Sequence, residues 1–345
     1  MKRVAEVTFL RELYGPQFVL LGSQGTPGER EANLMGRALS VTGKDEAGEV
    51  ARELMALDAS DEDPFGQQVN KTYRLADLFL RGSDSSRAIA LLSWDPTVPP
   101  EPGDYAMFVA RSTAARSLSG SRKVGAALVR VGRVVASGYN DVPAGQTPDV
   151  VAGRDTSEQF NRRNVEDTLR RLACEGLIAN ASSDQVAPAM VDRALAALDG
   201  GELISVIEYQ RAVHVEAGAL DDAAVRGVVT SGTDLYVTRF PSHLCYMHAL
   251  SAGVDKVRYI EPYSKSRARE MYPQGSDERL VPYEGVAPRA YTRVFDERPP
   301  PRSEGGAFRP VPPQESQPLL SQPRRAEDMD RDERLALRPI SRETT

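Results

Sequence analysis

The chain has 345 residues, with 43 lysines and arginines against 49 aspartates and glutamates, which gives a net charge of −6. No apolar run approaches the roughly 18–20 residues of a membrane-spanning helix, and the N-terminus lacks the apolar centre of a signal peptide. The two cysteines are too few for a disulfide framework, so we expect a protein of the reducing cytoplasm. The negative net charge argues against a nucleic-acid polymer as partner, but it is compatible with a local pocket that binds one nucleotide.

The first hundred residues have the pattern of an α/β segment. Short apolar runs bounded by glycine or proline predict buried strands, and apolar spacing of three and four predicts helices. Strands are expected at Phe18–Leu21 and Ala88–Leu92, helices at Glu29–Ala38 and Glu46–Leu57, and a helix end or a strand at Tyr73–Leu80.

From Tyr105 onward, strands alternate with helices, which implies a partly parallel sheet between helical layers. A helix at Tyr105–Leu118 precedes a hairpin that turns at Gly132, with arms at Val124–Val131 and Arg133–Ser137. The following stretch, Pro143–Asp155, has loop composition. Further helices are expected at Glu158–Ile178, Val191–Leu198, His214–Val225, His243–Ala252 and from Ser264, and further strands at Asp234–Arg239 and Lys256–Ile260.

The last 47 residues, Pro299–Thr345, differ in composition from the rest. They contain nine of the 24 prolines, eight arginines and eight acidic residues, with few apolar side chains. Such a segment cannot bury enough apolar surface to offset its chain entropy, so we predict a disordered tail.

The three histidines all lie within 35 positions, and two of them belong to motifs with chemical meaning. His214-Val215-Glu216 is followed by Pro241-Ser242-His243-Leu244-Cys245. Zinc nucleobase deaminases carry H-x-E followed by P-C-x-x-C, in which the histidine and two thiolates hold zinc and the glutamate moves protons. His214 and Cys245 are therefore candidate metal ligands, and Glu216 is the candidate catalytic acid and base.

Ser242 stands where this motif has its first thiolate, and a neutral hydroxyl is a poor zinc ligand. Three interpretations stay open. Zinc binds weakly through His214, Cys245 and water; the neighbouring His243 replaces the missing ligand; or the site has lost its metal. A shift of one residue turns a helical side chain by about 100°, which counts against the second interpretation.

The sequence resembles the cytidine/deoxycytidylate deaminase superfamily over about residues 105–295, and most of all its two-part bacterial anti-phage deoxycytidine nucleotide deaminases. The resemblance implies a three-layer α/β/α domain that hydrolyses dCMP or dCTP to the deoxyuridine nucleotide and ammonia, a role in antiviral defence, and homo-oligomeric assembly. It rests on motifs that occur in family order: Ser121–Val129 with Ala136–Pro143, Ile207–Glu216, Thr238–Cys245, Lys256–Ser266 and Val281–Tyr291.

The same resemblance suggests three substrate-binding residues. Asn140, at the end of the hairpin, corresponds to an asparagine that contacts the nucleotide sugar, although asparagine also suits a turn by itself. Lys265 and Arg289 are candidates for a phosphate contact, with solvated surface charge as the alternative for both.

In that family the N-terminal part resembles a P-loop nucleotide kinase, and residues 1–100 here resemble the later half of such a domain. The phosphate-binding motif G-x-x-x-x-G-K-[ST] is absent, and Gly43-Lys44-Asp45 does not replace it. We therefore expect no ATP hydrolysis. The expected domains are a partial kinase-like segment at 1–100, a deaminase domain at 105–295 and the tail from 299.

Two other functions are compatible with the same motifs. Loss of zinc through Ser242 would leave an inactive member of the fold that binds nucleotide or serves as a scaffold. Editing of a base in tRNA or DNA is disfavoured by the acidic balance and by the lack of a basic stripe.

The composition of the tail gives a first testable prediction. Deletion of Pro299–Thr345 should leave the midpoint of thermal unfolding nearly unchanged, because the segment has little apolar surface to bury. Differential scanning calorimetry of the truncated and full-length chains measures this. A drop of several degrees would show that the tail packs on the folded part.

Overall fold

A five-stranded sheet in the order β4-β3-β5-β6-β7 forms the centre of the computed structural model. The structure describes residues 1–15, 18–23, 25, 27–39, 44–59, 69–82, 85–92, 98–120, 122–178, 186–199, 201, 204, 209–263 and 265–295. β3 pairs antiparallel with β4 and β5, whereas β6 and β7 continue from β5 in parallel. The strands are β3 (Gly125–Arg130), β4 (Arg133–Tyr139), β5 (Asp234–Arg239), β6 (Lys256–Glu261) and β7 (Leu280–Pro282).

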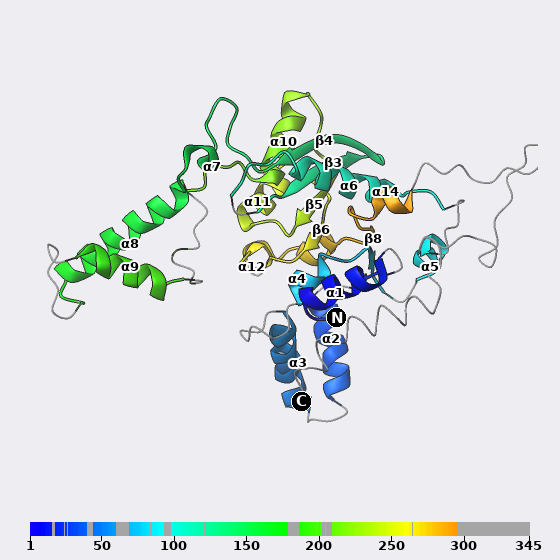
Figure 1. Ribbon diagram of the computed structural model, residues 1–345, viewed down its shortest axis with the longest axis horizontal. Helices are drawn as coiled ribbons and strands as arrows, with labels where there is room; N and C mark the ends of the chain where they lie inside the picture. Colours follow the sequence, from blue (N-terminus) through cyan, green and yellow to red (C-terminus); the bar gives the residue numbers. More distant parts are fainter. Residues whose placement is uncertain are drawn as a thin grey trace, which may run out of the picture.

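Helices cover both faces of this sheet, as the three-layer prediction requires (Figure 1). Ala126 and Leu128 of β3 face the cluster formed with α10 (Val215–Val225) and α11 (His243–Ser251). Ala127 and Val129 point to the other side, toward α6 (Pro102–Ala114). This alternation follows the two-residue period of a strand, and a strand that is buried on both faces contains few polar residues.

A second, three-stranded sheet has the order β1-β2-β8 and draws on both ends of the described chain. β1 (Leu21–Ser23) and β2 (Leu78–Leu80) pair in parallel, and β8 (Gly285–Val286) pairs antiparallel with β2. Phe79 of β2 belongs to the same buried cluster as α6. The N-terminal segment is thus packed directly against one helical layer of the central sheet.

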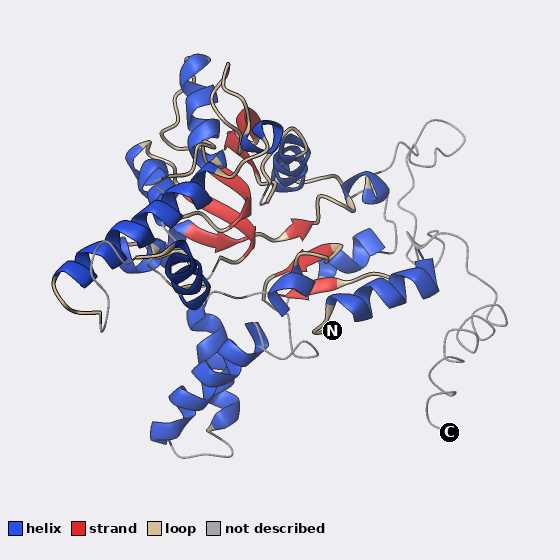
Figure 2. Ribbon diagram, turned by 60° about the vertical axis from the view of Figure 1, so that its left-hand side comes forward, coloured by secondary structure: helices blue, strands red, loops and turns tan. Residues whose placement is uncertain are grey.

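Two pairs of helices extend away from the sheets (Figures 1 and 2). One pair is α2 (Pro27–Ala38) and α3 (Lys44–Ala59), and the other is α8 (Thr156–Cys174) and α9 (Pro188–Ala197). The two helices of each pair pack against each other. Between α8 and α9 lies a small apolar cluster around Val165 and Val191. Helix α1 spans Val4–Tyr14. The other helices are short: α4 (Val69–Tyr73), α5 (Ser86–Leu92), α7 (Asp149–Ala152), α12 (Ala268–Met271), α13 (Ser276–Arg279) and α14 (Tyr291–Val294).

Some local expectations were wrong. The strand expected at Ala88–Leu92 is part of helix α5, because alanine and leucine favour a helix and Ala88 and Leu91, three positions apart, bury one face. The stretch Pro143–Asp155, expected to be a loop throughout, contains the short helix α7. Cys174, whose helical context suggested burial, is exposed. The tail from Pro299 lies outside the described residues. None of the described helices combines the length and the apolar content that crossing a bilayer requires.

Two glycines allow helices to lie directly on the sheet backbone. A Cβ at Gly125 would overlap the carbonyl oxygen of Ala110 in α6, and a Cβ at Gly138 would overlap the carbonyl oxygen of Val215 in α10. The second contact fixes how closely the first turn of α10 approaches the end of β4. That first turn carries Glu216, so the position of this carboxylate depends on a residue without a side chain.

Gly138→Ala should therefore lower the free energy of unfolding by about 3 kcal/mol, since backbone atoms rather than a flexible side chain would have to move. Gly36→Ala in α2 is the control, because nothing lies within 4 Å of its added Cβ. Alanine there should stabilise the chain by about 0.5–1 kcal/mol through helix propensity. Urea unfolding measures both variants, and equal effects of the two substitutions would contradict the close-contact explanation.

Candidate functional site

The segment that contains His214 is tied to the end of the β-hairpin. The N–H of Val213 donates to the carbonyl of Asp141 at 2.9 Å, in an isolated antiparallel bridge. His214 then serves as the N-cap residue of α10, with extended backbone angles. Because the chain enters the helix at this residue, Glu216 falls in the first turn and is buried.

A second helix begins beside the first. Ser242 is the N-cap of α11, and its hydroxyl accepts a hydrogen bond from the N–H of Cys245 at 3.2 Å. Serine is among the preferred N-cap residues because its oxygen satisfies a backbone donor that the helix leaves free. The stretch between β5 and α11 is fixed by the N–H of Phe240, which donates to the carbonyl of Glu261 at 2.7 Å.

The two helix N-termini bring four polar side chains together. His214 Nδ1 lies 3.2 Å from Cys245 Sγ and 3.5 Å from Ser242 Oγ. The potential ligand atoms of His214, Glu216 and Cys245 all lie within 4.8 Å of one another. Gln210 Oε1 lies 2.7 Å from His214 Nε2, and it accepts a hydrogen bond when that nitrogen carries the proton. In this tautomer the lone pair of Nδ1 points at the thiol.

This geometry fits a zinc ion. Zinc–nitrogen and zinc–sulfur bonds of roughly 2.0 and 2.3 Å in a tetrahedral arrangement place the two ligand atoms about 3.5 Å apart. The separation of 3.2 Å between His214 Nδ1 and Cys245 Sγ is close to that value. Imidazole and thiolate are preferred zinc ligands, whereas the Ser242 hydroxyl completes the group only as a weak donor. The fit is therefore good for two ligands and poor for the third.

Burial controls the protonation of the acidic groups. Desolvation raises the pKa of the Glu216 carboxyl, and the hydrogen bond with Cys245 and the nearby His214 offset this only in part. Desolvation also raises the pKa of the Cys245 thiol, and the negative charge of Glu216 adds to the effect. A raised pKa favours the protonated form of the carboxyl group, which is the form that a general acid needs.

A cavity of about 600 Å³ opens in front of these residues. This volume lies within the roughly 300–1,000 Å³ of small-molecule sites. Phe240 and Tyr263 supply aromatic surface, and Arg122 and Arg239 supply positive charge. The guanidinium of Arg239 lies over the ring of Tyr263 at 4.2 Å from its centroid.

Asn140 lines the same cavity but is already engaged. Its Oδ1 accepts from the N–H of Val124 at 2.9 Å, and its Nδ2 donates to the carbonyl of Arg122 at 2.8 Å. The amide thus joins the end of β4 to the segment that leads into β3. One N–H and one lone pair of the amide are left for a ligand, so the turn role and a sugar contact are compatible.

The structure does not bring every candidate to this cavity. His243, at the start of α11, is absent from the cluster of ligand atoms formed by the described residues. Lys265 is exposed and is absent from the described lining of the cavity. Arg289 donates to the carbonyl of Leu75 at 3.2 Å and lines a different cavity.

Sequence reasoning missed two residues that the structure places in the site. Gln210 lies four positions before His214, and Arg239 is the last residue of β5, the strand that leads to Ser242. The H-x-E motif does not include Gln210. This side chain reaches His214 from a loop, and the sequence does not specify the path of that loop. Arg239 lies within the motif segment Thr238–Cys245, but the sequence pattern there indicates only a strand.

Residues 101–261 match the family model of the cytidine and deoxycytidylate deaminase zinc-binding region. The deoxycytidylate deaminases of Enterobacteria phages T2 and T4 are 27% and 26% identical over 147 residues, which is 43% of this chain and 73% and 71% of theirs. ComE operon protein 2 of Bacillus subtilis (strain 168) is 32% identical over 77 residues, which is 22% of this chain and 41% of that protein. Over residues 101–261 the chain is therefore similar to this zinc-binding region and to these proteins.

Solved structures with similarity include the dCMP deaminase of cyanophage S-TIM5. Its apo form is 19% identical with a TM-score of 0.32, and it covers 54% of this chain and 98% of that one. Its complex with dCMP and dUMP is 21% identical with a TM-score of 0.33, over the same shares of the two chains.

The contact between Gln210 and His214 gives a prediction for metal affinity. Gln210→Ala should weaken zinc binding about 10–100-fold, because the partner that fixes the ring and its tautomer is lost. Gln210→Glu, which still accepts the Nε2 proton, should keep the affinity. Competition titration with a zinc-sensitive dye measures both variants. Equal weakening in the two variants would mean that Gln210 fills space without orienting the ring.

Proposed function

We propose that the cavity in front of His214 catalyses hydrolytic deamination of a deoxycytidine nucleotide. Water adds to C4 of the base, the C4–N bond breaks, and the deoxyuridine nucleotide and ammonia leave. The observation that carries the proposal is the meeting of two helix N-termini, with Nδ1 of His214 at 3.2 Å from Sγ of Cys245 and the buried Glu216 beside them. The deaminase-type match over residues 101–261 and the phage deoxycytidylate deaminases supply the substrate class.

Zinc is the cofactor that we propose for this site, held by His214 and Cys245. When bound, it would supply a water molecule whose pKa is lowered toward 7. Ser242 stands close enough to share the site, at 3.5 Å from His214 Nδ1, but its hydroxyl also accepts the Cys245 N–H. The affinity should therefore be below that of a site with one histidine and two thiolates.

Glu216 would carry the protons of the reaction. It lies buried beside the nucleophile position, and its raised pKa allows it to hold a proton between the two transfers. One proton goes from water to the ring nitrogen N3, and another goes to the amino group as it leaves. His214 and Arg239 stabilise the ionised form of Glu216 in part, although desolvation remains the largest effect on its pKa and raises it.

The rest of the cavity suits a nucleoside. The planar surfaces of Phe240 and Tyr263 can pack against a pyrimidine, and the remaining N–H of Asn140 can donate to a sugar hydroxyl. Of the cations in the cavity, Arg122 and Arg239 are placed to meet a phosphate. Lys265 and Arg289 are absent from the described lining of this cavity, so neither belongs to the phosphate contact proposed here.

A second function rests on the capping role of Ser242. The hydroxyl that would have to act as third ligand accepts the N–H of Cys245 in the first turn of α11, so this helix start has its capping bond without a metal. In this alternative the chain keeps the nucleotide cavity and serves as an inactive binding protein or scaffold.

Substitution of Ser242 separates the two functions. Ser242→Cys should raise zinc affinity by at least about tenfold and should raise or create deamination of dCMP or dCTP, because a thiolate replaces a hydroxyl. Ser251→Cys, at the exposed C-terminal end of the same helix, adds a thiol without a place in the site and should change neither property. Elemental analysis and release of ammonia measure the two effects.

Glu216→Gln in the Ser242→Cys background should abolish turnover while zinc stays bound, since the proton acceptor is lost. Glu175→Gln, on the exposed end of α8, is the matched control. Full zinc occupancy with fast turnover in the unaltered chain would show that Ser242 already completes the site. No gain of zinc binding from the cysteine would favour the scaffold function.

The biological role that we propose is depletion of deoxycytidine nucleotides during phage infection. Its support is the sequence resemblance to the two-part anti-phage deaminases. Homo-oligomeric assembly is likewise a proposal drawn from that resemblance.

A further inference from the structure

A second cavity, of about 340 Å³, lies between the N-terminal segment and the central sheet. The turn between α4 and β2, helix α6, and the ends of β5 and β6 all contribute to its wall. The lining contains one carboxylate, Glu261, and six cations: Arg74, Arg111, Arg122, Lys123, Arg239 and Arg289. Such an excess of positive charge is unexpected in a chain whose net charge is −6.

The nearby carboxylates do not balance these cations. Glu261 forms an ion pair with Arg122. Asp77 stands behind Arg289 at 3.7 Å but also pairs with Arg11 and Arg293, at 3.1 and 3.4 Å. Arg111 and Lys123 have no carboxylate partner among the described residues. Several of the positive charges around the cavity are therefore uncompensated.

Arg239 shows the cost of this arrangement. Its Nε is buried and has no hydrogen-bond partner in the described part of the chain. Desolvation, reinforced by Arg122, lowers the pKa of its guanidinium. Desolvation and Arg11 likewise lower the pKa of Arg289. A bound anion would remove both penalties, because it would supply acceptors and opposite charge at once.

We propose that this second cavity binds an oligophosphate group. Guanidinium groups match phosphate oxygens in pairs of parallel hydrogen bonds, and a chain of phosphates offers several negative charges to several arginines. The volume is at the small end of ligand sites, which suits a phosphate chain better than a whole nucleotide. Arg74 and Arg289 lie outside residues 101–261, so the site is additional to the deaminase-type match.

Arg122 and Arg239 line both cavities, so the oligophosphate has two sources. It is either the phosphate tail of a nucleotide whose base lies in the first cavity, or the tail of a separate nucleotide. Both sources present the same phosphate chain to the arginines. The number of nucleotides bound per chain distinguishes them.

Isothermal titration of the full-length, metal-free chain with inorganic tripolyphosphate tests the proposal without any need for turnover. We expect saturable binding that weakens as salt is added, because exposed charges are screened. Arg74→Glu and Arg111→Glu should each weaken binding about tenfold or more, since each removes a charged contact and adds a repulsive one. These two residues belong to different parts of the fold, so an effect of both would show that the site joins them.

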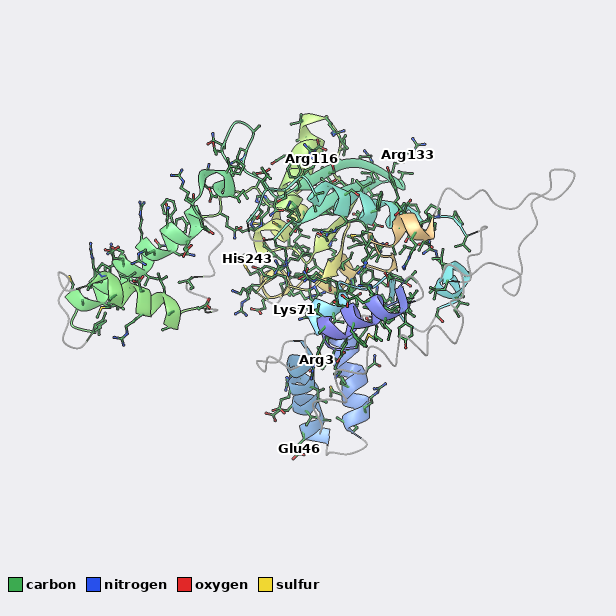
Figure 3. All side chains as sticks on the ribbon, viewed as in Figure 1. Arg3, Glu46, Lys71, Arg116, Arg133 and His243 are labelled. Carbon is green, nitrogen blue, oxygen red and sulfur yellow. The ribbon has the colours of Figure 1, made fainter. Side chains whose placement is uncertain are left out.

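Arg133→Glu is the matched control. Arg133 is exposed on the β3–β4 hairpin, well separated from Lys71 on α4, which lies near Arg74 in sequence (Figure 3). It should change tripolyphosphate affinity less than about twofold, although the change of net charge is the same. Far-ultraviolet circular dichroism confirms that each variant is folded, and Arg74→Ala replaces Arg74→Glu if that variant is not.

The outcomes decide the proposal independently of deaminase activity. Equal loss of affinity in Arg133→Glu and Arg74→Glu would overturn it, as would absence of tripolyphosphate binding at low salt. Binding of a DNA oligonucleotide that depends on Arg74, with no binding of tripolyphosphate, would also overturn it. One equivalent of dCTP per chain would assign the cavity to the tail of the nucleotide in the first cavity, and two would assign it to a second nucleotide.

Discussion

The packing of α10 on β4 is the constraint on which the candidate site depends. Gly138 allows the backbone of the helix to lie on the backbone of the strand. The Asp222 carboxylate accepts from the Ser137 N–H at 3.0 Å, which fixes the helix along the strand, and the Asp141–Val213 bridge fixes where it begins. With its start, direction and distance set, α10 can place His214 and Glu216 only opposite the N-terminus of α11. The site is therefore a consequence of backbone packing in the core.

Ser242 is subject to two different requirements. A helix N-terminus leaves backbone donors that need an acceptor, and serine meets this need well. A zinc site needs a charged, polarisable ligand, which serine is not. The structure shows the first requirement met by the bond from the Cys245 N–H to the Ser242 hydroxyl. That bond uses the oxygen from the helix side and leaves it 3.5 Å from His214 Nδ1, so capping and weak ligation are not mutually exclusive.

The elements of the central domain could be predicted because each is determined by local pattern. β3 and β5 contain consecutive apolar residues, as expected of strands that are buried on both faces, and the motif residues fall at helix starts. In the N-terminal segment, α5 was mistaken for a strand, because a run of seven residues is too short for period to separate the two. β8 has two residues and pairs with a strand more than 200 positions away, which no local pattern reveals. The same limit applies to the functional residues. The proposed metal ligands belong to sequence motifs, whereas packing of distant segments places Gln210 beside His214 and gathers the arginines of the second cavity.

The two arginines shared by the cavities couple their ligands electrostatically. An anion in the second cavity satisfies Arg239 and Arg122, and this lowers the positive potential that the first cavity presents to another phosphate. Two separate nucleotides would therefore oppose each other's binding, by an equal factor in both directions. A single nucleotide that spans both cavities would meet no such opposition, because only one set of phosphates would use the shared arginines.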